Sequence, residues 1–342
     1  MPHRTFLTFI LPSLFVMLLF IALPIVSVAY QSLYIEHEQV LTTVQNCGPF
    51  GCTTESRVDA AAMEKARREQ PMGRFNWLGT YTNPSHLAVD EVREIWRASP
   101  NLLSAAAGIF NLPLYSALAF TLAFTFIVTP LVIVLGFVIA VAVNSIHRLI
   151  KGPVIFFSLL PMIVTPLVGS LVLFWMIDSQ GVIGATLQRI FNDPQLSLKA
   201  SPTLTWIMLL VYGVWHSAPF SFVVFYAGLQ TVPGDTLESA MIDGASAWER
   251  IRFVVIPHLA PLATFVALMQ LMDNFRVFEP IVGFSASANA TSLSWLIFND
   301  LRSTDVPLFG SAAATSMLTI IGVLILLTPV LLRTWRDFNR KA

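Results

Sequence analysis

The sequence has few charged residues. Only 12% of its 342 residues are Asp, Glu, Lys or Arg, about half of the roughly 25% that a soluble domain carries. The positive and negative charges balance to a formal net charge of zero, which leaves no electrostatic case for nucleic-acid binding. Hydrophobic residues make up 55% of the chain, and its mean hydropathy is +0.70. This balance is typical of a protein embedded in a membrane.

Motifs that accompany common catalytic chemistry are missing from the sequence. It contains no G-x-x-x-x-G-K-[ST] phosphate-binding loop, no H-E-x-x-H and no G-x-S-x-G. The chain therefore has no P-loop of its own for ATP hydrolysis. His37-Glu38 lacks the second histidine of a zinc motif. We predict no catalytic residue, no metal site and no cofactor bound by this chain.

Long apolar runs are abundant in the sequence, and about 20 residues suffice for a helix to cross a bilayer. We predict an all-α membrane protein with about six transmembrane helices. Pro130 predicts a kink in the second helix, and Pro219 predicts a bend in the fourth. The six predicted spans are Phe6–Leu33, Leu114–Asn144, Val154–Ile177, Leu204–Leu229, Leu259–Phe284 and Leu308–Leu332.

Lys and Arg are concentrated after the second span, in the loop before the fifth span and after the sixth. The positive-inside rule therefore predicts that these segments and both termini are cytoplasmic. A long outer loop then follows the first span and contains a helix-compatible run, Val58–Glu69. The predicted organisation is a first transmembrane helix (1–35), a periplasmic loop with a short helical cap (36–112), a core transmembrane domain (113–335) containing a cytoplasmic loop (233–257), and a cytoplasmic tail (336–342).

Cysteine is scarce. The two cysteines, Cys47 and Cys52, lie in the outer loop as Cys-Gly-Pro-Phe-Gly-Cys. Disulfides persist outside the cytoplasm, so a disulfide that closes this tight turn is the favoured interpretation. Two free thiols are an alternative. A metal site is a weaker alternative, because it needs more ligands than this loop offers.

The polar loop between the fourth and fifth spans carries two helix-start signals. Asp235 and Glu238 have the spacing of a capping box, which predicts a helix from about residue 236. Gly244 suits the left-handed conformation that ends a helix. Ser246 and Glu249 repeat the capping-box spacing.

Pro257 then predicts the start of the next segment. Such a compact, doubly capped unit between two spans suggests a surface that binds another protein.

Polar residues inside spans are costly in lipid, so they face protein or a water-filled path. Three such residues in the fifth span share one helical face with a valine, and their amides and carboxylate suit a ligand rich in hydroxyl groups. Arg276 is three residues from both Asp273 and Glu279, so either can form an ion pair with it. Packing between helices without ligand contact is the alternative. The four residues are Gln270, Asp273, Asn274 and Val277.

The fourth span places His216 and Ser217 close to Pro219 and Phe220. Bent helices line binding sites in transporters, so this segment is a second candidate wall of a path. A histidine that only packs inside the bundle is the alternative.

The run from Glu238 to Ala245, E-S-A-x-x-D-G-A followed about 11 residues later by Ile256-Pro257, resembles the EAA loop of binding-protein-dependent ABC importer permeases. Trp77-Leu-Gly-Thr-Tyr81, Leu160-Pro161 and Phe275-Arg-Val-Phe-Glu279 resemble the carbohydrate-uptake subgroup, the maltose- and glycerol-3-phosphate-type permeases. The Gly-Gly-Pro that often follows the fifth span in this subgroup is absent, which weakens the assignment of a particular substrate.

The resemblance implies a type I ABC importer permease in the bacterial inner membrane that moves a sugar or sugar derivative. It implies a second, distinct permease, two cytoplasmic ATPases that bind ATP and Mg²⁺, and a periplasmic solute-binding protein. The implied ATPase-coupling residues are Glu238, Ala240, Asp243, Gly244 and Ala245. The residues implied to line the substrate path are Gly213, His216, Ser217, Phe220, Gln270, Asp273, Asn274 and Val277.

Three other functions remain open from the sequence. The same machine could carry another small polar solute such as a polyamine, because Asp273 is acidic. A membrane-embedded glycosyl-transferring enzyme would need a catalytic pair, whereas the close charged pairs in the chain resemble internal ion pairs. An ion-driven transporter would often show inverted repeats, which the sequence lacks.

Overall fold

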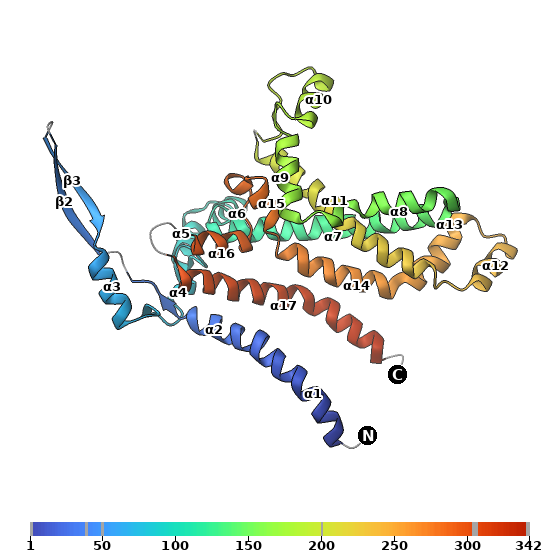
Figure 1. The fold of residues 1–342 in the computed structure, drawn as a ribbon, viewed down its shortest axis with the longest axis horizontal. Helices are drawn as coiled ribbons and strands as arrows, with labels where there is room; N and C mark the ends of the chain where they lie inside the picture. The colour runs from blue at the N-terminus through green and yellow to red at the C-terminus, as the bar shows by residue number, and fades with distance from the viewer. Residues whose placement is uncertain (1–2, 38–39, 49–50, 200, 303–306, 340–342) are drawn as a thin grey trace. The chain divides into compact units, whose positions relative to one another are not determined.

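The computed structural model describes the chain except at residues 1–2, 38–39, 49–50, 200, 303–306 and 340–342 (Figure 1). The described residues are mostly helical, with two small antiparallel pairs of strands. The chain divides into two compact units. The first contains Met1–Tyr115 and Leu296–Ile320, and the second contains Ser116–Trp295 and Ile321–Ala342.

Five helices among the described residues are long and apolar enough to cross a membrane. A sixth crossing can be made by α8 (Arg148–Ile163) together with α9 (Pro166–Met176), which meet at an angle of 96°. The predicted all-α class with about six spans is therefore confirmed. The five single helices are Thr8–Gln31, Pro113–Ser145, Pro202–Leu229, Ala247–Phe275 and Phe309–Arg333.

The third predicted span, Val154–Ile177, contains a break that the sequence analysis did not predict, between α8 and α9. Val164 and Thr165 are in extended conformation at the break. A residue that precedes proline is disfavoured in the α conformation, and Pro166 follows Thr165. Hydropathy is unaffected by this break, so the apolar run alone did not reveal it.

The fifth predicted span, Leu259–Phe284, also needs correction at both ends. The observed helix begins at Ala247 and ends at Phe275, and a separate short helix, α15 (Glu279–Gly283), follows. Pro280 explains the ending, because in a continued helix its ring would clash with the carbonyl of the residue four positions earlier.

Two five-residue π-helical segments interrupt the α-helical hydrogen bonding, η1 (Leu18–Ala22) and η2 (Ile251–Val255). Each ends two residues before a proline, Pro24 or Pro257. The N–H of the residue just before the proline bonds to the carbonyl five residues earlier. The wider turn lets each helix continue past a residue without an N–H. Pro257 lies in the first turn of α14, as predicted, but the chain is already helical from Ala247 onwards.

The first unit contains a long β-hairpin that the sequence did not indicate, β2 (Leu41–Gly48) paired with β3 (Gly51–Val58). The predicted helix at Val58–Glu69 is confirmed as α3 (Ala60–Glu69), and Asp59 caps it by accepting the N–H groups of the second and third residues after it. The remaining elements of this region are β1 (Tyr34–Ile35), which pairs with β4 (Arg74–Phe75), and the helices α4 (Gly79–Thr82), α5 (Val89–Ala98) and α6 (Leu102–Phe110).

The two cysteines face each other in the backbone register of this hairpin, since Cys47 pairs with Cys52. Facing positions of an antiparallel pair are about 4.5 to 5.5 Å apart at Cα, which is within the range of a disulfide. The side chains of both cysteines lie outside the described residues. The disulfide therefore stays a prediction.

A buried polar network stabilises the first unit around His86. Its Nε2 lies 3.1 Å from the carbonyl oxygen of Ser311 and 3.1 Å from Oγ1 of Thr315. The Ser311 hydroxyl in turn donates to Asp300 at 2.7 Å. Burial lowers the pKa of His86 and raises the pKa of Asp300. Both groups are thus biased towards their neutral forms.

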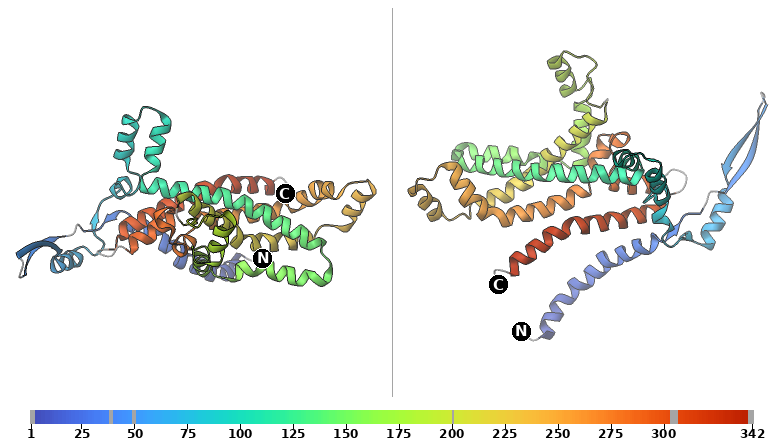
Figure 2. Two further views of the ribbon diagram at one scale, coloured as in Figure 1. Left: turned by 90° about the horizontal axis from the view of Figure 1, so that it is seen from above. Right: turned by 180° about the vertical axis from the view of Figure 1, so that it is seen from behind.

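The second unit is built on α7 (Pro113–Ser145), α11 (Pro202–Leu229) and α14 (Ile256–Phe275). Figure 2 shows α8, α11 and α14 side by side, and they pack in that order. Both α7 and α11 continue through their internal prolines without a break. The other elements of this unit are α10 (Val182–Phe191), α12 (Gly234–Ile242), α13 (Ala247–Arg250) and η3 (Ala286–Ala288). Two helices, α16 (Leu293–Leu301) and α17 (Phe309–Asn339), are divided between the two units.

Threonines form a buried ladder along α7. The Thr121 hydroxyl donates to the carbonyl of Ala117 at 2.7 Å, and the Thr125 hydroxyl donates to the carbonyl of Thr121 at 2.7 Å. Each hydroxyl therefore satisfies its hydrogen within its own helix. Thr121 also accepts the N–H of Leu293 at 3.2 Å, which ties the start of α16 to α7.

Candidate functional site

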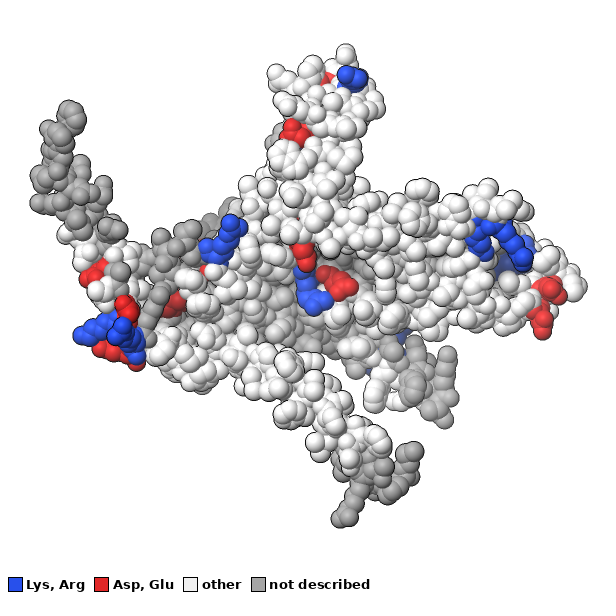
Figure 3. Space-filling model, viewed as in Figure 1, with Lys and Arg blue, Asp and Glu red and all other residues white. Residues whose placement is uncertain are grey.

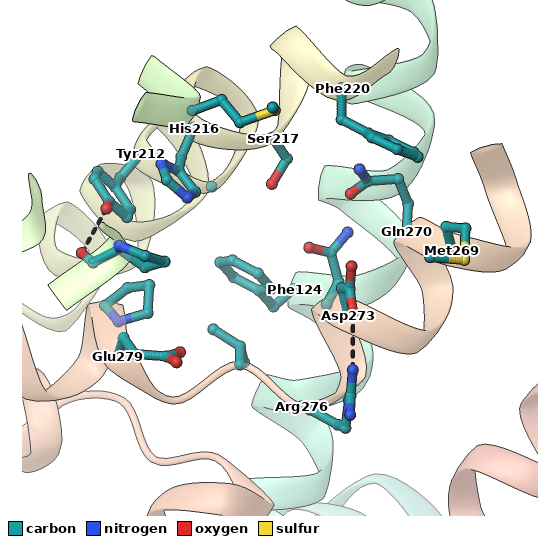
Figure 4. A pocket seen from close by; sticks show the side chains of 16 residues that line it. Phe124, Tyr212, His216, Ser217, Phe220, Met269, Gln270, Asp273, Arg276 and Glu279 are labelled. Carbon is teal, nitrogen blue, oxygen red and sulfur yellow. Dashed lines mark hydrogen bonds and ion pairs between the residues drawn. The ribbon is translucent and has the colours of Figure 1, made fainter. Parts of the chain in front are cut away.

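A cavity of about 560 Å³ lies inside the second unit, where α11 faces the end of α14 (Figure 4). Its wall also includes residues of α7, α8, α9 and α15. The residues that line it are Phe124, Met162, Pro166, Tyr212, Gly213, His216, Ser217, Phe220, Met269, Gln270, Asp273, Asn274, Arg276, Val277, Glu279 and Pro280.

The α11 wall is held by two close contacts. A Cβ at Gly213 would lie 2.6 Å from the Phe124 ring, so only glycine lets this ring approach the helix. The Tyr212 hydroxyl donates to the Pro166 carbonyl at 2.6 Å. The Tyr212 ring also stacks on His216, with centroids 5.7 Å apart and planes 8° apart. These contacts fix the aromatic and imidazole faces that border the cavity.

The α14 wall carries two buried amides. Asn274 is 5% exposed and donates to the Thr129 hydroxyl at 3.0 Å. Gln270 is 4% exposed, and its Oε1 has no hydrogen-bond partner among the described residues. A buried acceptor without a partner is costly. A ligand hydroxyl in the cavity would relieve that cost.

Charged side chains lie at the C-terminal end of α14. Arg276 Nη2 lies 2.8 Å from Asp273 Oδ1, and both side chains are about half exposed. Of the two ion pairs that the sequence allowed, this is the one formed. Glu279 makes no ion pair with a described residue, and Figure 4 shows its carboxylate beside the cavity. Elsewhere the face seen in Figure 3 is mostly uncharged, with charged side chains in a few small groups.

All eight residues predicted for the path line this one cavity. That they contact a solute stays a prediction. Sequence reasoning missed several neighbours for identifiable reasons. Tyr212 precedes His216 by one turn and could have been found by periodicity. Met162 and Pro166 flank the unpredicted break, and Glu279 and Pro280 lie beyond the end of α14, so helical periodicity could not place them.

The loop between α11 and the fifth span forms a second candidate site. Gly244 has φ of 82°, which confirms the predicted left-handed end of the helix. The N–H of Ala245 bonds to the Ala240 carbonyl at 2.9 Å, and the N–H of Gly244 bonds to the Met241 carbonyl at 3.1 Å. This pair of bonds is a Schellman motif.

Only one of the two predicted capping boxes forms. The Ser246 hydroxyl accepts the N–H of Glu249 at 3.3 Å, while the Glu249 carboxylate accepts the N–H of Ser246 at 2.7 Å. The box predicted at Asp235 is wrong, because α12 begins at Gly234 after Pro233 without a side-chain cap. Asp235 instead lies in the first turn, where a carboxylate interacts favourably with the free N–H groups.

Large apolar side chains are exposed on this loop and the helix start that follows. Met241 is 56% exposed, Ile242 87%, Trp248 64% and Phe253 67%. Such a cluster beside charged residues is typical of a surface that another protein covers. The coupling role of Glu238 and its neighbours stays a prediction.

Comparison with known proteins identifies the family of this chain. No family model matches it. It is 30% identical over 208 residues to the trehalose/maltose transport system permease protein MalF of Thermococcus litoralis, covering 60% of this chain and 69% of that protein. It is 31% identical over 190 residues to the trehalose transport system permease protein SugA of Mycobacterium tuberculosis, covering 55% and 60%. The maltodextrin permease MdxF of Bacillus subtilis is 30% identical over 238 residues, covering 63% and 54%.

The fold agrees with a solved structure of a bacterial ABC transporter involved in the import of the acidic polysaccharide alginate. That chain aligns with a TM-score of 0.65 at 16% identity, over 97% of this chain and 96% of the other. The fold is thus that of a membrane-spanning ABC importer permease. Together with the sequence relatives, it shows that the chain belongs to the permease subunits of sugar ABC transporters. It is a transport subunit, which rules out the glycosyl-transferring alternative.

Proposed function

We propose that this chain forms one half of the sugar path of an ATP-driven importer in the bacterial inner membrane, beside a second, distinct permease. The main support for the proposal is the 560 Å³ cavity. It is lined by residues of α11 and α14 that were predicted from the sequence on two separate spans. Ligand cavities commonly measure about 300 to 1,000 Å³.

The lining chemistry favours a sugar as the solute. The amides of Gln270 and Asn274 and the hydroxyl of Ser217 offer donors and acceptors for sugar hydroxyls. The rings of Phe124 and Phe220 offer apolar surfaces for the C–H faces of a sugar. The trehalose, maltose and maltodextrin named for the relatives are the first solutes to test.

The loop at 233–257 is proposed to bind a cytoplasmic ATPase subunit, one of two that hold ATP and Mg²⁺. Glu238, Asp243 and Gly244 are exposed on this loop, and Ala240 and Ala245 are half-buried. Exposed Met241 and Ile242 supply apolar contact area. A periplasmic binding protein delivers solute on the other side. A solved complex of the alginate transporter with its solute-bound periplasmic protein supports this, with a TM-score of 0.57 at 18% identity.

Purification of the tagged protein from its native membrane tests the assembly. Mass spectrometry should identify a second permease and a P-loop ATPase. With the binding protein added, sugars should stimulate ATP hydrolysis, and Glu238→Ala should reduce both ATPase recovery and stimulation. Stimulation by a polyamine but by no sugar would overturn the solute class, and recovery of the chain alone would overturn the assembly.

A further inference from the structure

Two short helices of the first unit, α5 and α6, form an antiparallel hairpin that precedes the second transmembrane helix (Figure 2, left). The nine residues of α6, Leu102–Phe110, include no charged side chain. In contrast, α5 has a polar side with Asp90, Glu94 and Arg97. The hairpin is therefore amphipathic as a unit.

The packing of α6 is the reverse of that in a water-soluble helix. Two of its small residues face α5: Ala105 is 3% exposed, and a Cβ at Gly108 would lie 2.8 Å from Cγ2 of Ile95. Its large residues face outward, with Leu103 84% exposed and Phe110 54% exposed. Leu103 and Phe110 are seven residues apart, so they share the side of α6 opposite to α5.

A surface helix in water buries its large apolar side chains and exposes polar ones. The opposite arrangement is stable when the outer surroundings are apolar. Leu102, the first residue of α6, is also 75% exposed. This exposed apolar surface therefore requires apolar surroundings in the native protein.

The chain itself places the hairpin near lipid. Phe110 is three residues before Pro113, where the membrane-spanning helix α7 begins. Three residues span at most about 10 Å. Phe110 therefore lies within about 10 Å of the first residue of a helix that is long and apolar enough to cross a membrane.

The partner helix α5 carries residue types that suit the lipid headgroup region. Trp96 is 59% exposed, and Trp is enriched where membranes meet water. Arg93 lies on the neighbouring side of the helix. Its apolar stem can lie along lipid while the guanidinium group reaches phosphates. Glu94 lies on the side that turns away from Trp96.

We propose that the α5–α6 hairpin is a membrane-surface anchor, with Leu103, Phe110 and Trp96 immersed in the phospholipid leaflet on the side of residues 36–112. In this arrangement Glu94 faces water. The partner is a lipid surface, and the anchor holds the first unit against the bilayer beside the start of α7.

Spin labels at single cysteines in the full importer test this proposal. The background carries Cys47→Ser and Cys52→Ser, and the assembly sits in nanodiscs of phosphatidylethanolamine and phosphatidylglycerol. Leu103→Cys and Phe110→Cys report the proposed lipid side, and Glu94→Cys is the water control in the same hairpin. Leu324→Cys on α17, a residue 59% exposed in a membrane-spanning helix, is the lipid reference.

Labels at Leu103 and Phe110 should collide with oxygen several-fold more than with a water-soluble nickel chelate, as at Leu324, while the label at Glu94 shows the reverse. Equal nickel access at Leu103, Phe110 and Glu94 would place the surface in water and overturn the proposal. Protection of Leu103 and Phe110 from both reagents would mean that protein covers it, which also overturns the proposal. Because all labelled side chains are exposed, failure to fold is not expected to obscure the result.

Discussion

Two glycines at the ends of one short helix, α12, differ in backbone conformation. Gly244 has φ of 82°, whereas the φ of Gly234 lies outside the left-handed range, and a Cβ at either position would meet no atom within 4 Å. Alanine at 244 is therefore opposed by backbone conformation alone, at about 1 to 2 kcal/mol. The same change at 234 meets no such strain.

We predict that Gly244→Ala distorts the end of α12 and lowers solute-stimulated ATP hydrolysis by the assembled importer, whereas Gly234→Ala leaves it near the wild-type rate. ATPase measurements with and without solute check both variants. Equal stimulation in the two variants would show that the left-handed turn has no part in coupling.

At Gln270, a single substitution should change stability and function in opposite directions. Its Oε1 is buried without a partner among the described residues, a condition that costs about 1 to 3 kcal/mol. We predict that Gln270→Leu raises the thermal unfolding temperature but lowers sugar uptake by about tenfold or more, because a lost hydrogen bond to solute of about 1.4 kcal/mol corresponds to a tenfold change.

Met269→Leu is the matched control for this prediction. Met269 lines the same cavity, and a swap of similar volume is usually tolerated. Thermal unfolding and uptake are measured on both variants. Unchanged uptake in Gln270→Leu would mean that the amide serves packing and not solute binding.

At the scale of elements, the sequence predicted those helix ends that depend on local chemistry. The left-handed turn at Gly244 depends on the backbone freedom of glycine itself. The capping box at Ser246 depends on two side chains only three residues apart. The box at Asp235 failed because the helix had already begun at Gly234.

Breaks inside apolar runs were harder to predict. Residues of the cavity that lie near such breaks were therefore missed. The bend at Pro166 and the end of α14 before Pro280 leave hydropathy unchanged. The path residues on α11 were indicated by the nearby Pro219 and by the family resemblance. Helical periodicity correctly grouped Gln270, Asp273 and Asn274 on α14, whereas Val277 lies beyond the end of that helix. Periodicity could not place Met162 or Glu279, because each joins the cavity through a change of chain direction.

The network around His86 links the loop before α5 to the start of α17 and predicts a pH effect on stability. Burial lowers the pKa of His86, so the folded state holds the ring neutral while the unfolded chain binds a proton near pH 6.5. The unfolded state then binds more protons as pH falls, and stability decreases from about pH 7 towards pH 5.

Asp300 acts with the opposite sign, because burial raises its pKa. Its contribution to stability is present at low pH and is lost as pH rises above the unfolded value near 3.9. We predict that His86→Gln flattens the decrease in unfolding temperature between pH 7 and 5. Asp300→Asn, which leaves the histidine in place, should keep that decrease. An unchanged slope in His86→Gln would contradict the prediction.

At the scale of the whole molecule, the side of the membrane on which each loop lies can be tested with thiol chemistry. Ile242, 87% exposed in the 233–257 loop, provides a cysteine position on the proposed cytoplasmic side. Cys47 and Cys52 report on the opposite side.

We predict that in spheroplasts an impermeant maleimide labels Cys47 and Cys52 only after reduction, and labels Ile242→Cys only after permeabilisation. Labelling of the native cysteines before reduction would show free thiols in place of the predicted disulfide. Labelling of Ile242→Cys in intact spheroplasts would reverse the proposed orientation.

The threonine ladder of α7 has a consequence for how the protein is made. During synthesis α7 enters the bilayer before α11 and α14 exist to pack against it. The hydroxyls of Thr121 and Thr125 already bond to carbonyls of their own helix, so this segment carries those polar groups into lipid without waiting for a neighbour. Asn274 of α14 bonds to Thr129 of α7. Because α7 precedes α14 along the chain, Thr129 is already in the membrane when Asn274 enters it. The order of the spans along the chain thus suits a one-by-one passage from the ribosome into the membrane.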